Sequence, residues 1–189
     1  MGCVIPIVMR MKTSDQALAK AAADGDRDAF SVLLERRYDG IFRLAFRLTG
    51  NRNEAEDLTQ DICASLPEKL AAYRAEAQFS TWLYRVVVNG AHDRRRRAAT
   101  RTKAADGWGS WEVNRRATDQ EVAQNVDWLT HAMASLTSDL RDTLALLMDD
   151  EMTQAQAAIV LGVSEGTVSW RVSEAKKSLR LLAQKEAAQ

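Results

Sequence analysis

The sequence contains little cysteine, little proline and no long hydrophobic run. Its two cysteines, Cys3 and Cys63, form no metal-binding or redox motif, which fits a reducing, cytoplasmic compartment. Only two prolines, Pro6 and Pro67, interrupt the chain. The apolar stretch at residues 4–8 is too short to span a membrane, and it lacks the preceding basic region of a signal peptide. We therefore expect no stable membrane insertion.

Residues that favour α-helices dominate the rest of the chain. Ala, Leu, Arg, Glu and Gln are abundant and strand-favouring residues are sparse, so intrinsic propensity predicts helices throughout. The length of 189 residues suits one ordinary domain or two small ones, and the hydrophobic content of 46% is typical of a globular protein. The sequence therefore predicts an all-α fold that needs no disulfide or metal ion for stability.

The formal net charge is zero, which at first argues against a nucleic-acid partner, because affinity for phosphates needs clustered positive charge. The charges are unevenly distributed, however. Residues 85–103 carry seven basic side chains against one acidic one, and residues 152–189 carry five against three. Residues 104–151, between them, carry three basic and ten acidic side chains. Two basic patches separated by an acidic middle indicate two separate contacts with a polyanion.

Helical periodicity begins in the first half of the chain. Over residues 28–49 apolar side chains recur at intervals of three and four, which predicts a long amphipathic helix closed by Gly50. A second helix is predicted from near Asn53, with Ala55, Leu58, Ile62 and Leu66 as its buried stripe. The opposite face gathers Asp57, Gln60, Asp61 and Ala64. Two carboxylates and an amide are therefore expected on one exposed surface.

A third helix is predicted from Ser80, a plausible N-cap, to the arginine run at residues 94–97. Its apolar residues are Trp82, Leu83, Val86 and Val87, and another face aligns Arg85, Asn89, Asp93 and Arg96. Residues 98–118 lose this periodicity and mix Gly, Ser and charged residues with Trp108 and Trp111. We interpret them as a flexible linker.

The chain thus divides into four segments. Residues 1–23 form a tail with the start of the first helix, and residues 24–97 form the first helical domain. The linker over 98–118 then leads to a second helical domain over 119–189. This second domain begins with two further helices, whose periodic apolar residues are Val122, Val126, Leu129 and Met133 in one, and Leu140, Leu144 and Leu147 in the other.

The strongest local motif lies near the C-terminus. Thr153 and Gln156 have the spacing of a capping box and open a short helix that ends at Leu161, before Gly162. Ser164 can cap a longer helix, whose apolar seam comprises Val168, Val172, Ala175, Leu179 and Leu182. A short helix, a glycine turn and a longer helix form a helix-turn-helix.

The longer helix is expected to turn polar residues outward: Thr167, Ser169, Trp170, Arg171, Ser173, Lys176 and Lys177. The second helix of such a motif enters the DNA major groove, where Arg pairs with guanine while Lys and backbone amides hold phosphates. The alternative is a three-helix packing unit with solvated Lys and Arg side chains, and Glu174 on this face opposes phosphate binding.

In their order and spacing, three stretches resemble the extracytoplasmic-function (ECF) sigma factors, the smallest class of the sigma-70 family, over about residues 24–184. EAEDLTQDICASLPEKL (54–70) resembles the second conserved region, and FSTWLYRVVVNGAHDRRRR (79–97) resembles the promoter-melting and minus-ten-reading region. The helix-turn-helix with GTVSWRV (166–172) resembles the minus-thirty-five reader. The stretch between residues 97 and 119 is too short for the additional domain of larger sigma factors.

Some positions depart from the family pattern. Gln156, Ala157 and Ala158 replace the Glu-Ile-Ala that is usual in the first helix of the motif. Trp170 and Glu174 occupy positions where small or basic residues are common. These differences leave the promoter sequence open.

The resemblance implies a non-enzymatic subunit without cofactors that binds core RNA polymerase, directs it to promoters and helps to open the DNA. Asp57, Gln60 and Asp61 would dock on the basic clamp helices of the polymerase's largest catalytic subunit. Melted minus-ten bases would be held by Phe79, Ser80, Trp82, Arg85, Asn89, Asp93, Arg96 and Arg97. From spacing alone, Phe79 and Trp82 can equally be buried anchors. The duplex minus-thirty-five element would be read by Ser164, Thr167, Ser169, Trp170, Arg171, Ser173, Lys176 and Lys177.

Two other functions are considered. The first is a stand-alone helix-turn-helix regulator that binds DNA as a dimer without polymerase. The second is a nuclease that uses Asp57 and Asp61, but neither His92 nor His131 falls at metal-ligand spacing with them and no nucleophile is near. An anti-sigma factor is a further partner implied by the resemblance.

Overall fold

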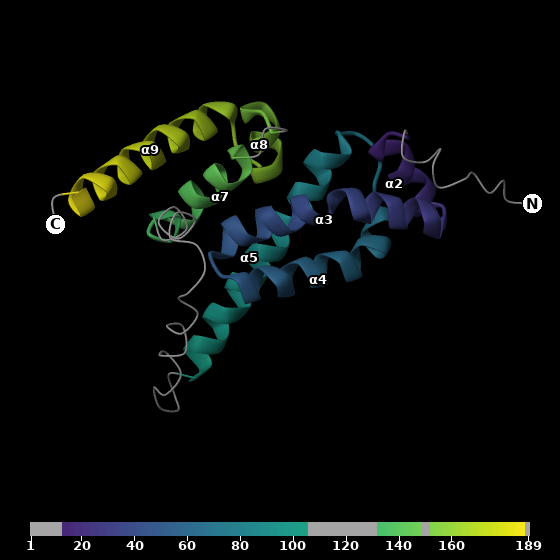
Figure 1. Ribbon diagram of the computed structural model, residues 1–189, viewed down its shortest axis with the longest axis horizontal. Helices are drawn as coiled ribbons and strands as arrows, with labels where there is room; N and C mark the ends of the chain where they lie inside the picture. Colours follow the sequence, from purple (N-terminus) through teal and green to yellow (C-terminus); the bar gives the residue numbers. More distant parts are fainter. Residues whose placement is uncertain (1–12, 106–131, 149–151, 188–189) are drawn as a thin grey trace, which may run out of the picture.

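The computed structural model describes residues 13–105, 132–148 and 152–187, and every regular element in these ranges is a helix. The first group comprises α2 (Asp15–Ala23), α3 (Arg27–Thr49), α4 (Arg52–Leu70) and α5 (Phe79–Ala105). The second comprises α7 (Ser138–Leu147), α8 (Gln154–Leu161) and α9 (Glu165–Ala187). Figure 1 shows both groups, with the C-terminal part of α5 projecting away from them. The all-α prediction is confirmed.

Local capping explains where α3 and α4 begin and end. The carboxylate of Asp26 accepts hydrogen bonds from two backbone amides in the first turn of α3, and α3 ends at Gly50, whose φ of 70° is left-handed. Asn51 caps α4 by accepting from the backbone N–H of Glu54 at 3.0 Å. The predicted bounds of α3 and the predicted start of α4 each agree with the structure to within one residue.

The region before α3 contains a helix that the periodicity did not separate. Ser14 caps α2 by accepting from the backbone N–H of Ala17, and Leu18 and Ala19 are buried. Asp15 forms ion pairs with Arg36 and Arg37 of α3, which hold α2 against the longer helix. The N-terminal segment thus contributes a packed helix of its own.

Two details of α5 differ from the prediction. The helix begins at Phe79 with Gln78 O accepting from the N–H of Trp82, so Ser80 lies inside the first turn and is not the cap. It continues to Ala105, eight residues beyond Arg97, so the expected linker starts later than residue 98. Its continuation is rich in Ala, Arg and Lys, which favour helices, and Thr100 Oγ1 donates to Arg96 O at 3.0 Å.

The helix-turn-helix is confirmed as a local structure. Thr153 and Gln156 form both hydrogen bonds of a capping box, and Gly162 ends α8 in the left-handed conformation with φ 67°. Ser164 Oγ then accepts from the backbone N–H of Thr167 and caps α9. Val168 and Ala175 of the expected seam are fully buried. The predicted helix with Val122, Val126 and Leu129 lies outside the described residues, as do Trp108 and Trp111.

The core of the first group lies among α3, α4 and α5 and positions their polar faces outward. Leu33, Leu44, Leu58 and Val87 are essentially inaccessible to solvent. Gly90 permits a close crossing, because a Cβ there would lie 2.9 Å from Ile62 Cδ1. Within the described ranges, no helix is long and apolar enough to cross a membrane.

Candidate functional site

The acidic face of α4 is exposed, as the helical periodicity predicts. Asp57, Gln60 and Asp61 all lie on the solvent side of the helix. Arg94 of α5 reaches this face, with Nη2 2.8 Å from Asp61 Oδ2 and Nη1 3.9 Å from Asp57 Oδ2. The structure therefore adds a guanidinium that sequence spacing assigned only to the basic run. A partner that binds the carboxylates must share them with Arg94 or displace it.

A polar face follows α5 along its exposed side. Arg85, Asn89 and Arg97 are exposed, and Asp93 forms an ion pair with Arg96 at 3.0 Å. Positions 85, 89, 93 and 96 lie three or four residues apart, so they share one face of the helix. This face can contact a polyanion through its guanidinium groups and base edges through Asn89.

An aromatic cluster lies at the start of α5. The Tyr73 ring, in the loop between α4 and α5, lies 5.0 Å from that of Trp82 and 5.6 Å from that of Phe79. Phe79 is only 3% exposed, so in this structure it is a core anchor and has no surface to offer a base. Trp82 is partly exposed, and Ser80 is partly exposed beside it. Of the two readings left open by spacing, the structure favours the buried anchor for Phe79.

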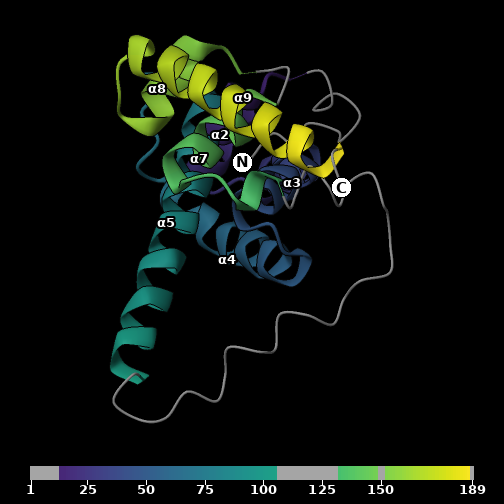
Figure 2. The same ribbon diagram turned by 90° about the vertical axis from the view of Figure 1, so that its left-hand side faces the viewer.

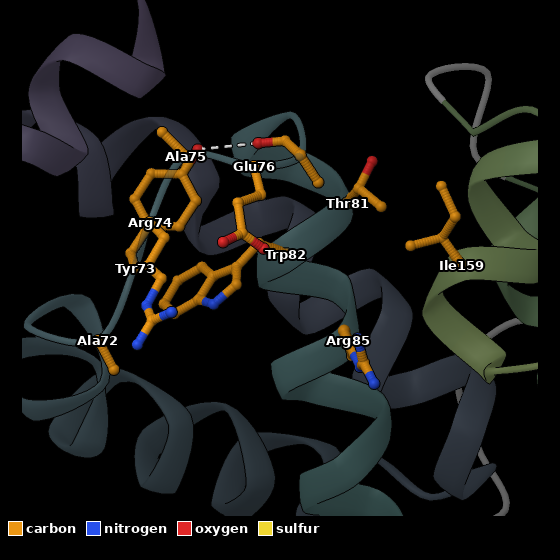
Figure 3. A pocket seen from close by; sticks show the side chains of 10 residues that line it. Ala72, Tyr73, Arg74, Ala75, Glu76, Thr81, Trp82, Arg85 and Ile159 are labelled. Atoms are coloured by element: carbon orange, nitrogen blue, oxygen red, sulfur yellow. Dashed lines mark hydrogen bonds between the residues drawn. The ribbon is translucent and has the colours of Figure 1, made fainter.

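A pocket of about 180 Å³ opens beside this cluster (Figure 3). It lies between the α4–α5 loop and the first turns of α5, and Ile159 of α8 also lines it. Tyr73 Oη donates to Ala77 O at 3.1 Å, the dashed bond in Figure 3, which fixes the loop wall. Burial raises the pKa of the Tyr73 phenol, so it stays a neutral donor there. The lining residues are Ala72, Tyr73, Arg74, Ala75, Glu76, Ala77, Thr81, Trp82, Arg85 and Ile159.

The loop side of this pocket was not predicted from the sequence. Tyr73 and Arg74 precede α5 in a segment without periodicity, where a helical pattern gives no signal. Ala75 adopts φ 56°, which is strained for a residue with a Cβ. An aromatic residue followed by arginine between two helices was the only available indication.

The outward face of α9 is less uniform than expected. Trp170 is 61% exposed, and Ser173, Lys176 and Lys177 are exposed. Ser169 is exposed as well, with its hydroxyl bonded to Gln154 Oε1 at 2.6 Å.

Three residues predicted for this face make contacts within their own domain instead. The side chain of Arg171 is only 14% exposed, and its Nη2 lies 2.6 Å from Asp139 Oδ2 of α7. The expectation that it faces freely outward is wrong, because position 171 lies three residues after Val168 and four before Ala175, beside the buried seam. Ser164 and Thr167 are joined through their hydroxyls at 2.8 Å as part of the cap.

The described residues hold no group of three or more His, Cys, Asp or Glu side chains placed to bind a metal ion. His92 instead lies 2.7 Å from Asp142 of α7. Burial raises the pKa of the Cys63 thiol, so its reactive thiolate form is disfavoured. Asp57 and Asp61 are therefore surface carboxylates that pair with Arg94.

Comparisons with known proteins identify two family regions in this chain. The model of sigma-70 region 2 matches residues 33–101, and that of sigma-70 region 4 matches residues 127–179. The ECF RNA polymerase sigma factor SigM of Mycobacterium tuberculosis is 34% identical over 174 residues, which cover 92% of this chain and 86% of SigM.

Two solved structures share the fold. CnrH in complex with the cytosolic domain of CnrY has a TM-score of 0.67 and 24% identity, covering 90% of this chain and 97% of CnrH. The sigma factor RpoE in complex with the anti-sigma factor NepR from Bartonella quintana has a TM-score of 0.68 and 22% identity, covering 82% and 96% of the two chains. With both family regions present in order on an all-helical fold, this chain belongs to the ECF sigma factors of the sigma-70 family.

Proposed function

We propose that three exposed surfaces divide the work of this alternative sigma factor, which directs RNA polymerase to promoters. The acidic face of α4, with Asp57, Gln60 and Asp61, docks on basic helices of core RNA polymerase. Both carboxylates are about two-thirds exposed, so they are accessible to a basic partner. Complementary charge favours the orientation and the rate of such an encounter.

The start of α5 and the neighbouring pocket hold unpaired bases of the minus-ten element. The single observation that carries this assignment is the pocket, because it combines an aromatic wall at Tyr73 and Trp82 with the exposed guanidinium of Arg85. A separated base exposes a stacking face, and stacking on an aromatic side chain contributes about 1–3 kcal/mol per base. Contacts of this size can offset the opening of a few base pairs without ATP.

The exposed face of α9 reads the minus-thirty-five element as duplex. Trp170 and Ser173 are placed to meet base edges, and Lys176 and Lys177 are placed to meet phosphates. Arg171 can join them by exchanging Asp139 for a guanine. The chain acts in the cytoplasm, where its polymerase and DNA lie, and has no enzymatic activity of its own.

An anti-sigma factor is a further proposed partner. The structures of CnrH and RpoE contain the cytosolic domain of CnrY and the anti-sigma factor NepR, respectively. Co-purification of this chain with one binding protein that blocks its transcription would support the proposal.

Reconstituted transcription with core polymerase on a promoter library tests the assignment. We expect transcripts that require both promoter elements, loss of core binding in Asp61→Ala, and loss of promoter opening with intact core binding in Asn89→Ala. Tight binding of the isolated chain to a duplex, without any transcript when core is added, would favour the stand-alone regulator. Metal-dependent DNA cleavage lost in Asp61→Ala would favour the nuclease.

A further inference from the structure

The second group of helices packs directly on the first. Helix α7 lies against α3 and helix α8 against α5 (Figures 1 and 2). Gln156 Nε2 of α8 donates to Gln78 Oε1 at 2.9 Å, and Arg47 Nη1 of α3 donates to Ala145 O of α7 at 3.3 Å. One cluster of buried side chains includes residues of both groups: Leu44, Val87, Leu146 and Ala157. The two domains therefore share a continuous core.

Asp142 of α7 is the charged centre of this interface. Its side chain is 3% exposed, and its Oδ2 accepts from Arg95 Nη2 at 2.7 Å and lies 2.7 Å from His92 Nε2, both on α5. Its other oxygen has no partner. Leu140, two residues earlier and on the opposite side of α7, packs against Ala175 of α9. Helix α7 thus buries one face inside its own domain and the other against the first domain.

The contacts of Asp142 with Arg95 and His92 indicate a specific interface. A buried carboxylate is strongly disfavoured unless it is paired, and both of its partners belong to the other domain. With the domains apart, Asp142 would be hydrated and would need neither partner. Its burial in the second domain is therefore explained by closure onto the first.

The closed arrangement is incompatible with reading a promoter. The minus-ten and minus-thirty-five elements lie about 25 base pairs apart, which is about 85 Å along B-DNA at 34–36 Å per helical turn. In the structure α8 contacts α5, and Ile159 of α8 forms a wall of the proposed base pocket. Asp57, Gln60 and Asp61 remain exposed. Docking on polymerase can therefore precede the separation of the domains, whereas promoter reading must follow it.

We propose that Asp142, with His92 and Arg95, forms an autoinhibitory latch that holds α7–α9 over the start of α5 in the free chain. Opening the latch frees the base pocket and lets α9 reach the upstream element. The effect on promoter reading rests on the proposed role of the pocket, whereas closure itself does not.

Closure is tested without DNA or polymerase by energy transfer between dyes on cysteines at Glu76, just before α5, and Ala155 of α8, in a chain with Cys3 and Cys63 replaced by serine. Both positions are exposed and lie beside the Gln78–Gln156 contact, so the closed state brings the two dyes close together. Asp142→Asn should lower the transfer, because Arg95 loses its anionic partner. Asp139→Asn is the matched control, since it removes a carboxylate from the same helix that pairs only within its own domain. Transfer in Asp142→Asn equal to that of the control would overturn the latch.

A second variant tests the latch if Asp142→Asn does not fold. His92→Ala changes a half-exposed side chain of α5 and should lower the transfer in the same direction, by a smaller amount. Unchanged transfer in His92→Ala, with native helicity, would equally refute the role of the histidine in the latch.

Autoinhibition is tested by a reducible bis-maleimide bridge between cysteines at Gln78 and Gln156 in the same cysteine-free chain. The bridged chain should bind core polymerase but fail to open a promoter, and reduction of the bridge should restore opening. Promoter opening by the bridged chain, or failure of the two cysteines to bridge, would refute the closed and inactive state. If the reduced chain also fails to open any promoter, the proposed function is at fault and the energy-transfer result still decides closure.

Discussion

Removing Arg94 should strengthen the binding of this sigma factor to core RNA polymerase. The guanidinium lies 2.8 Å from Asp61 and 3.9 Å from Asp57, so it screens the carboxylates that we propose as the docking site. Because both carboxylates are largely exposed, the pair is worth only about 0.2–1 kcal/mol. If polymerase must displace Arg94, Arg94→Ala recovers that free energy, and Kd falls about 1.4-fold to 5-fold.

The affinity for core enzyme is measured without DNA, because phosphates would compete for the basic face of α5. Fluorescence anisotropy at two salt concentrations is suitable, since the gain should shrink as salt screens the exposed charges. Arg52→Ala is the matched control. Arg52 is an exposed arginine paired with Glu56 at 2.9 Å on the same helix, so its loss changes the net charge equally without uncovering Asp57 or Asp61.

A double-mutant cycle separates unmasking from a general charge effect. Asp61→Ala should weaken docking, and Arg94→Ala in that background should gain little, because the main carboxylate it screens is gone. Weaker binding of Arg94→Ala than wild type would show that the arginine positions the acidic face for polymerase. An equal gain with and without Asp61 would also refute the reasoning.

Three further outcomes follow from the structure. Arg171→Ala should weaken minus-thirty-five recognition in a footprinting assay and leave core binding unchanged. Asp139→Asn only frees the Arg171 guanidinium, so it should not weaken recognition. Equal losses in the two variants would show that the ion pair is structural. Phe79→Ala should lower the free energy of unfolding by about 3–5 kcal/mol in a denaturant titration, because it removes a buried ring, whereas Trp82→Ala should destabilise less but abolish promoter opening; the reverse order would exchange their roles. Ala75→Gly should raise the free energy of unfolding by about 1 kcal/mol, because glycine adopts the left-handed φ of 56° without strain. Part of this gain is offset because glycine also makes the unfolded chain more flexible. A less stable variant would disprove the strain.

Sequence succeeded where the signal was local. The cap of α8 depends on Thr153 and Gln156, three residues apart, and its end depends on Gly162, so neighbouring residues alone determine both. The same holds for the end of α3 at Gly50. The exposed acidic face of α4 followed from helical periodicity, because a helix fixes which residues share a side.

Sequence was less informative where a side chain meets a distant helix. Arg94 was assigned only to the basic run, Arg171 to the outward face of α9, and Asp142 to no site. Each of them has its partner on another element, 32 to 50 residues away. Such pairs depend on tertiary packing, which periodicity does not encode. Helix α2 was also not predicted as a separate helix, because its short buried face, Leu18 and Ala19, gives only a weak periodic pattern.

These ion pairs, together with a local one, bear on how a chain of zero net charge could carry the two DNA-reading faces that we propose. Several basic groups on or beside α5 and α9 are neutralised by the chain's own carboxylates: Arg94 by Asp61, Arg95 by Asp142, Arg96 by Asp93 and Arg171 by Asp139. The positive charge that remains for phosphates is therefore smaller than the count of basic residues suggests. Because phosphate neutralisation sets non-specific affinity and its salt dependence, the free chain should bind DNA weakly and with a shallow salt slope. Docking on polymerase can redistribute these pairs, first at Asp61, so recognition of the promoter becomes a property of the complex.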